Sequence, residues 1–143
     1  MLSKTCEYAI RALIYIAQKS KEGNNVGIKE IAAGIDSPEY FIAKILQELS
    51  RKGFVQSMKG PNGGFYMDKN NLETSIADIV REIDGDKIFS GCGLGLKECS
   101  EEHPCPIHND FKNIRQEMKN MLENSKIKVF VDNLNLKLTF LKK

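Results

Sequence analysis

One stretch of the chain, PEYFIAKILQELSRKGFVQSMKGPNGGFYM at residues 38–67, limits the possible folds more than any other. Its first half repeats apolar residues at spacings of three and four, which predicts a helix over 38–51 with one buried face. Gly53 follows at a position where a left-handed glycine often ends a helix. Two β-prone runs at 54–58 and 65–67 then flank a cluster of proline, asparagine and glycine, which predicts a hairpin. We therefore expect a helix that runs directly into a hairpin.

Two further helices are expected before this stretch. Apolar residues recur on one face of residues 3–20, and a shorter apolar stripe follows at 28–34. Ser37 and Pro38 then have the residue types preferred at the N-cap and at the first position of a helix. Two helices joined by such a short turn match a helix-turn-helix. Closed by the hairpin, these elements predict a winged helix-turn-helix.

The second half of the chain has a different pattern. A fourth helix is expected after Ser75, which can form a capping box with Asp78, and Gly85 closes it. A long helix is expected over 106–124, where apolar residues alternate at spacings of four and three, as in helices that pack on other helices. These residues are Ile107, Phe111, Ile114, Met118 and Met121. Because the winged helix already closes a core, we interpret this long helix as a dimerisation helix.

The C-terminal tail fits two structures. Residues from Ile127 suit a short helix capped by Ser125, whereas Leu134 to Phe140 alternate as in a strand, and we take the helix first. The expected fold class is therefore mostly α with a small β-hairpin wing. We expect a winged helix-turn-helix domain over 1–84, a cysteine-rich loop over 85–105, and the dimerisation helix with the tail over 106–143.

Hydropathy and local motifs exclude several classes of protein. No run of 18 apolar residues occurs, so no membrane partner is expected. The N-terminal helix has Glu7 and Arg11 inside its apolar pattern and no cleavage signal, which predicts a cytoplasmic protein with reduced thiols. No phosphate-binding loop and no nucleophile–base spacing occur, so an enzyme is not expected. The net charge of +2 is too small to indicate nucleic-acid binding by itself.

The segment CGLGLKECSEEHPCPIH, residues 92–108, carries the clearest chemical signal. Its spacing lacks the pair of cysteines two to four residues apart that structural zinc sites usually have. Three thiolates and one imidazole in a loop suit an iron–sulfur cluster, and the neighbouring glycines would let the backbone bend around it. Zinc binding and metal-free, redox-reactive thiols stay open as alternatives. The candidate donors are Cys92, Cys99, Cys105 and His108.

Residues 38–67, the cysteine segment and the long helix together resemble the Rrf-type winged-helix regulators, a bacterial family that includes IscR, NsrR and CymR. The likeness covers residues 1 to about 125 and implies a homodimeric transcription factor on a pseudo-palindromic double-stranded DNA operator. It also implies an iron–sulfur cluster on the four candidate donors, 2Fe–2S rather than 4Fe–4S, although the first gap is one residue longer than in the 2Fe–2S branch. Glu7 lies where nitric-oxide-sensing relatives offer a carboxylate to the partner subunit's cluster, and it is an alternative fourth ligand.

The resemblance further implies that the helix at 38–51 enters the major groove of DNA and that the hairpin tip contacts the minor groove. The residue pattern agrees, because Tyr40 and Lys44 lie away from the apolar stripe of that helix. Phe41 is both a member of the apolar stripe and a matching contact position. The DNA contacts implied at matching positions are Ser3, Lys4, Pro38, Tyr40, Phe41, Lys44, Lys59 and Gly60.

Three functions stay open from the sequence. The leading hypothesis is a DNA-binding regulator that senses redox state, nitric oxide or iron–sulfur status through a cluster. The second is a winged-helix regulator whose thiols sense oxidants without a metal. The third is a small iron–sulfur electron carrier in which the N-terminal half is only a scaffold.

Overall fold

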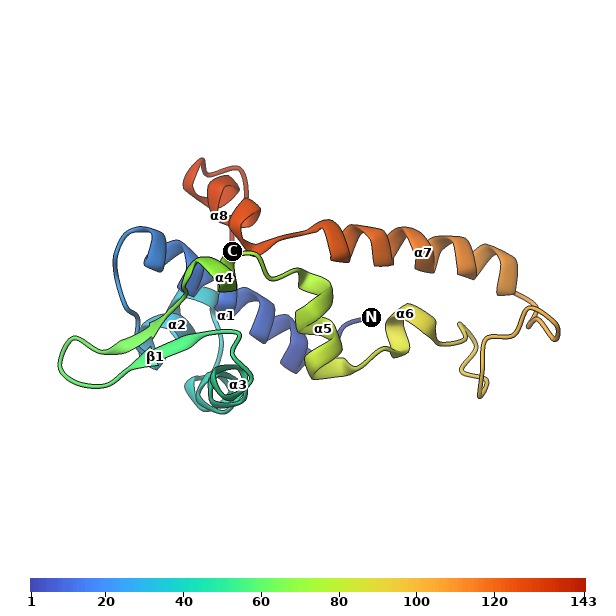
Figure 1. Cartoon of the computed structure of the whole chain (residues 1–143), viewed down its shortest axis with the longest axis horizontal. Coiled ribbons are helices and arrows are strands. Elements are labelled where there is room, and N and C mark those ends of the chain that lie inside the picture. The colour runs from blue at the N-terminus through green and yellow to red at the C-terminus, as the bar shows by residue number, and fades with distance from the viewer.

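The computed structural model describes all 143 residues and shows a head of packed helices from which one long helix extends (Figure 1). The structure is mostly helical with one antiparallel hairpin, which confirms the expected fold class. None of the helices combines the length and the hydrophobicity needed to cross a bilayer. The elements in chain order are α1 (Lys4–Lys21), α2 (Ile28–Ile35), α3 (Glu39–Arg51), β1 (Gln56–Met58), β2 (Gly64–Tyr66), α4 (Lys69–Leu72), α5 (Ile76–Asp84), α6 (Lys87–Ser90), α7 (His108–Asn124) and α8 (Ile127–Asn135).

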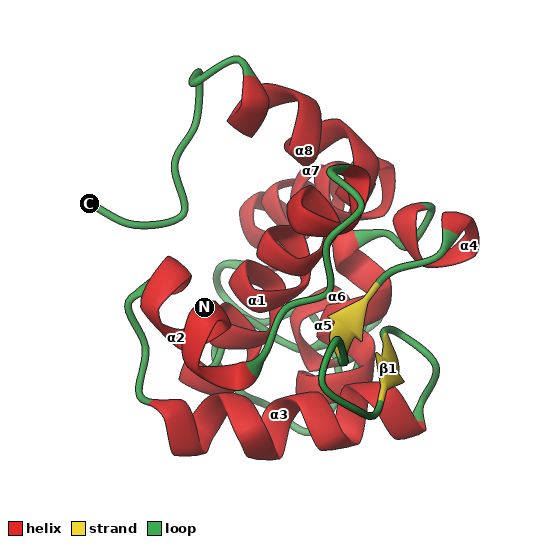
Figure 2. Cartoon of the chain, turned by 90° about the vertical axis from the view of Figure 1, so that its left-hand side faces the viewer, coloured by secondary structure: helices red, strands yellow, loops and turns green.

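The head is built around α1. Ser3 caps this helix by accepting a hydrogen bond from the backbone N–H of Cys6 at 3.1 Å. The helices α2, α3, α5 and α8 all pack against α1, as Figure 2 shows. Through α8, Ile127 and Val131 enter the same hydrophobic core as the N-terminal helices. The first and last helices of the chain therefore stabilise each other. The expected division of the chain into a domain over 1–84, a loop over 85–105 and a C-terminal part over 106–143 stays a prediction.

The hairpin forms where the sequence predicts it. Its two strands pair with Ser57 opposite Phe65. Val26, which precedes α2, extends the pairing, because its N–H donates to the carbonyl of Phe65 at 3.0 Å and its carbonyl accepts the N–H of Phe65 at 2.7 Å. The hairpin is thus attached to the head along one edge, and its tip extends away from the head (Figure 1).

The start of α3 differs by one residue from the prediction. Pro38 is the N-cap, with an extended backbone, and the helix begins at Glu39. Asp36 takes the left-handed conformation, with φ 55°, at the end of α2. The N–H of Ser37 donates to the carbonyl of Ala32 at 3.0 Å, and its hydroxyl is buried without a partner. Ser37 therefore closes α2 instead of capping α3, and the expected N-cap role is wrong.

Two short helices are absent from the sequence prediction. In α4, Asp68 and Asn71 form a capping box. In α6, buried Phe89 anchors a single turn against the core. Each helix has four residues, so neither contains enough positions to produce a helical hydrophobic period.

The tail forms the predicted helix, α8, although Ser125 does not cap it. Lys126 is the N-cap of α8, and Ser125 ends α7. The N–H of Ile76 donates to the carbonyl of Ser125 at 2.9 Å, and the N–H of Ile127 donates to the carbonyl of Thr74 at 3.1 Å. These bonds fix the turn between α7 and α8 to the start of α5, which explains its extended backbone.

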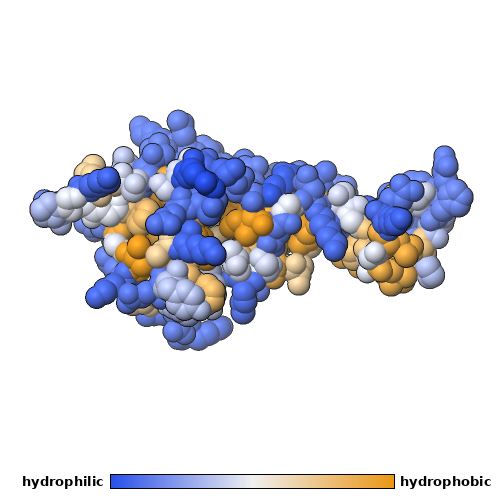
Figure 3. Space-filling view, turned by 90° about the horizontal axis from the view of Figure 1, so that it is seen from below, coloured by the Kyte–Doolittle hydropathy of each residue, from blue (hydrophilic) through white to orange (hydrophobic).

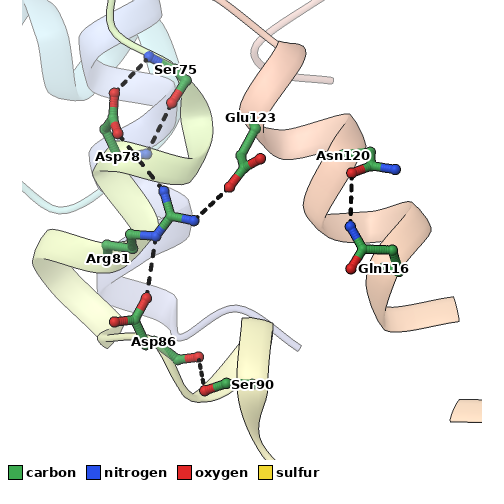
Figure 4. A network of polar contacts seen from close by, with 8 residues as sticks. All are labelled: Ser75, Asp78, Arg81, Asp86, Ser90, Gln116, Asn120 and Glu123. Carbon is green, nitrogen blue, oxygen red and sulfur yellow. Dashed lines mark hydrogen bonds and ion pairs between the residues drawn. The ribbon is translucent and has the colours of Figure 1, made fainter. Parts of the chain in front are cut away.

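Arg81 on α5 joins three helices (Figure 4). Its guanidinium donates to Glu123 on α7 at 2.7 Å and to Asp86, just before α6, at 3.2 Å. It also lies 4.5 Å from the ring centre of Phe89 on α6. The hydrogen bond to Glu123 is the main reason that the pKa of Arg81 is raised. The last turn of α7 is thereby attached to the head, while its first turns extend away.

A substitution at Gly64 can test how closely the hairpin approaches the backbone of Val26. Its φ is +138°, and an added Cβ would lie 2.7 Å from the carbonyl oxygen of Val26. We expect Gly64→Ala to lower the free energy of unfolding by ~2 kcal/mol or more, measured by urea denaturation. Gly23→Ala is the matched control, because Gly23 has a φ of +84° but open space around it, and should cost about 1 kcal/mol. Equal costs at the two positions would contradict the close approach.

Candidate functional site

The cysteine segment joins α6 to α7 and folds at the end of the molecule farthest from the hairpin (Figure 1). Two glycines, one just before the segment and one within it, lie where a side chain would not fit. A Cβ on Gly91 would lie 2.6 Å from the carbonyl oxygen of Lys87, and one on Gly93 would lie 2.8 Å from the ring of Phe111 on α7. The backbone therefore approaches α6 and α7 closely, which agrees with the bend that the sequence predicts.

Cys99 meets His108 at the start of α7. The Cys99 Sγ lies 3.4 Å from His108 Nδ1 and accepts a hydrogen bond from Arg115 Nη1 at 3.3 Å. The His108 side chain is 4% exposed, and its Nε2 is 3.4 Å from Glu101 Oε2 without a hydrogen bond. Glu101 itself pairs with Lys112, which is the main reason that the pKa of Glu101 is lowered. A thiol, an imidazole and three charged groups thus meet on one side of α7.

Cys92 lies against backbone amides of its own turn. The Cys92 Sγ accepts the backbone N–H of Leu94 at 3.4 Å. This N–H, followed by that of Leu96, lowers the pKa of Cys92; burial opposes the shift, and the Cys105 thiol adds to it as a hydrogen-bond donor. Backbone amides therefore stabilise a negatively charged sulfur in this glycine-containing turn.

The donor set fits an iron–sulfur cluster in its chemistry. It offers three partly buried thiols and one buried imidazole, whose Nε2 has no hydrogen-bond partner. Two of the four donors, Cys99 and His108, lie in direct contact. No three acidic, cysteine or histidine side chains are arranged so that they could hold a single metal ion. The predicted set of cluster ligands therefore stays a prediction.

Glu7 lies away from this segment on the first turn of α1. Its carboxylate pairs with Lys4 Nζ at 3.0 Å and is 41% exposed. As an acid in the first turn of a helix it also interacts favourably with the helix dipole. Its role as a ligand toward a partner subunit stays a prediction.

The candidate DNA contacts on α3 lie on one exposed end of the helix. Tyr40 is 70% exposed and stacks on Phe41, with 4.2 Å between the ring centres. Phe41 is 39% exposed and also stacks on Tyr8 of α1, so it is only partly buried, unlike the rest of the apolar stripe. Pro38 and Lys44 are exposed beside them. The two aromatic rings therefore connect the exposed start of α3 with α1.

The remaining candidate contacts lie at the hairpin tip and the N-terminus. Lys59 and Gly60 are exposed, and the Asn25 side chain supports the tip by donating to the carbonyl of Asn62 at 3.1 Å. Lys4 is exposed at the start of α1.

Ser3 is already bonded within the chain. Its N–H donates to Asp84 Oδ2 at 2.9 Å, and its hydroxyl donates to the other oxygen of Asp84 while accepting the Cys6 N–H. The contacts of Ser3 with Asp84 and of Cys99 with Arg115 had no signal in the sequence, because the residues in each pair are far apart along the chain.

A family model and a similar protein sequence both match regulators of transcription. The family model Rrf2, described as "Iron-dependent Transcriptional regulator", matches residues 2–133. A protein of Aquifex aeolicus, named as an HTH-type transcriptional regulator, is 33% identical over 135 residues, which are 92% of this chain and 92% of that protein. These matches are to regulators, which confirms that the chain is not an enzyme.

Two solved structures share the fold. CymR, described as the global cysteine regulator of B. subtilis, has a TM-score of 0.77 at 21% identity, over 92% of this chain and 96% of its own. T. potens IscR has a TM-score of 0.73 at 16% identity, over 97% of this chain and 91% of its own. At these identities the likeness concerns the winged-helix fold alone.

The four cysteines differ in accessibility, and alkylation can measure the difference. Cys6 is fully buried on α1, and burial, with a smaller contribution from Asp84, raises its pKa to about 12. We expect iodoacetamide to modify the three cysteines of the segment in the folded, metal-free protein at neutral pH and to leave Cys6 unmodified, as read by peptide mass spectrometry. Protein unfolded in urea is the control and should be modified at all four. Rapid modification of Cys6 in the folded protein would contradict the buried position.

Proposed function

Because the chain belongs to the Rrf2 family of DNA-binding transcriptional regulators, we propose that it is a cytoplasmic, homodimeric sensor that holds an iron–sulfur cluster. The observation that carries this proposal is the contact between Cys99 and His108 on α7, the helix that leaves the head. The proposed ligands are Cys92, Cys99, Cys105 and His108, with Glu7 of the partner subunit as an alternative fourth ligand.

The exposed end of α3 supports DNA binding by the proposed residues. Tyr40 and Lys44 face solvent, so they can contact base edges and phosphates in the major groove. The hairpin tip with Lys59 and Gly60 can lie against the neighbouring minor groove. Pro38, Phe41, Ser3 and Lys4 surround this surface as further contacts. Two such heads about 34 Å apart would match a pseudo-palindromic operator.

The exposed row on α7 supports a dimer. Ile107, Ile114 and Met121 recur every seven residues and are 39%, 64% and 55% exposed. Leu94 and Leu96 of the cysteine segment add to the apolar surface at the same end of the molecule (Figure 3). A row of this kind is buried when two such helices pack together. We therefore propose a second copy of the chain as its partner.

The attachment of α7 at both of its ends supports sensing. At its first turn, His108 contacts Cys99, and at its last turn Glu123 pairs with Arg81 of the head. A cluster, when bound, would supply a centre that oxygen, nitric oxide or iron shortage alters. Through the contact of His108 with Cys99, the conformational order of the cysteine segment would then affect the position of α7. A change in that order would shift the population of dimers whose heads fit the operator.

A metal-free regulator is the second candidate. It is favoured by Cys92, whose pKa is lowered by backbone amides and which lies beside the Cys105 thiol. Such a pair could respond to oxidants directly. Membership of a regulator family favours both of these functions over the electron carrier.

The test of the proposed function combines cofactor analysis with DNA binding. Protein purified without oxygen should be coloured and contain iron and acid-labile sulfide, and Cys99→Ser should lose both, whereas Cys6→Ala should keep both.

Duplexes selected from a random-sequence pool should bind at least about tenfold differently with and without the cluster. Affinity should fall steeply with salt because phosphate contacts release counterions. Iron-free protein whose DNA affinity responds to peroxide would establish the metal-free candidate instead.

The proposed dimer predicts that a charge placed in the exposed apolar row of α7 changes the oligomeric state. Ile114→Lys should convert the protein from dimer to monomer, as read by light scattering during gel filtration, because it puts a charge into the exposed apolar row. Asn113→Lys adds the same charge at the neighbouring exposed position and should remain dimeric. A wild-type monomer, or equal masses for the two variants, would refute α7 as the dimer interface.

A further inference from the structure

We propose that Arg115 is a positioning residue of the cysteine site that holds Cys99 in place and stabilises negative charge on the sulfur ligands. The inference rests on the proposed function, since it concerns how the chain's own residues would support an iron–sulfur cluster. Arg115 lies on α7, seven residues after His108, and its side chain is partly buried.

The guanidinium of Arg115 joins two parts of the cysteine segment. Its Nη1 donates to the carbonyl of Gly91 at 2.6 Å and to Cys99 Sγ at 3.3 Å. Gly91 ends α6 and directly precedes Cys92. One side chain therefore holds the backbone before the first cysteine and the sulfur of the second. Arg115 therefore fixes the positions of Cys99 and of the backbone before Cys92 relative to α7.

Arg115 belongs to a continuous face of α7. Phe111 and Lys112 lie three and four residues after His108, and Arg115 lies four and three residues after them, so the four side chains lie on one side of the helix. Each contacts the segment: His108 meets Cys99, Phe111 lies against Gly93, and Lys112 pairs with Glu101. Arg115 is the member of this face that contacts both a backbone carbonyl and a ligand sulfur.

The charges around Arg115 assign it an electrostatic role. Lys112 is neutralised by its ion pair with Glu101, whereas Arg115 has no carboxylate partner. A guanidinium stays protonated at every physiological pH, so its positive charge faces Cys99 permanently. Such a charge favours the state with more negative charge on the sulfur ligands. When one electron from an added reductant enters a bound cluster, the net charge becomes more negative, and Arg115 should favour that reduced state.

Three variants separate charge from packing. Arg115→Gln removes the charge but keeps a polar side chain with an N–H donor. Arg115→Lys keeps the charge but loses the forked geometry. Lys112→Gln is the matched control, because it removes a neighbouring charge that Glu101 already neutralises. All are made in the full chain and purified without oxygen, and circular dichroism checks that each variant is folded.

The measurement is a dithionite titration followed by visible absorbance. Arg115→Gln should raise the ratio of oxidised to reduced cluster at a fixed potential by about tenfold. This change corresponds to a reduction potential that is ~59 mV lower for a one-electron couple. Arg115→Lys should restore most of this difference, and Lys112→Gln should change the ratio much less. Arg115→Gln should also lose iron to a chelator faster than the wild type, because Cys99 is no longer held.

The outcomes distinguish this inference from the proposed function. Wild-type protein without iron and sulfide would overturn both. Iron-containing wild type with an unchanged potential in Arg115→Gln, or with the same shift in Lys112→Gln, would overturn only the role of Arg115. A Gln variant that folds but takes up no cluster, while the Lys variant does, would support it.

Discussion

Close packing around α1 is the constraint on which the rest of the structure depends. Ala9, Ala12 and Ala17 are fully or almost fully buried, and their small side chains let neighbouring helices approach closely. Helices from both ends of the chain use this surface, because α8 packs on α1 beside α2, α3 and α5. The exposed start of α3 and the last turn of α7 are therefore parts of one packed unit.

The helix α7 divides its surface between two tasks. One face, from His108 to Arg115, holds the cysteine segment, and the adjacent row with Ile114 is exposed. Its last turn is fixed to the head through Glu123 and Arg81. In the proposed sensor, this arrangement would connect the state of the cysteines to the head, since one helix makes both contacts.

Most of the fold could be predicted from local sequence patterns. Apolar periodicity is a local property, so it located α1, α2, α3 and α7 within a few residues, and turn and capping residues located the hairpin and α5. The errors have local causes too: Ser37 closes α2 because Asp36 turns left-handed, and α6 is too short to show a period. Phe41 fits the buried stripe by its spacing, yet it lies at the exposed start of α3, where it stacks on Tyr8 and Tyr40 and stays partly exposed.

The sequence by itself determined the donor types and their spacing, the helix-turn-helix with its hairpin, and the family that these features resemble. Only the tertiary structure decided which donors meet, with Cys99 beside His108. It also decided that Arg115 reaches Cys99 and that Asp84 engages Ser3. The physical reason is that spacing and periodicity describe neighbours along the chain, whereas these contacts join residues that only the packing of separate segments brings together.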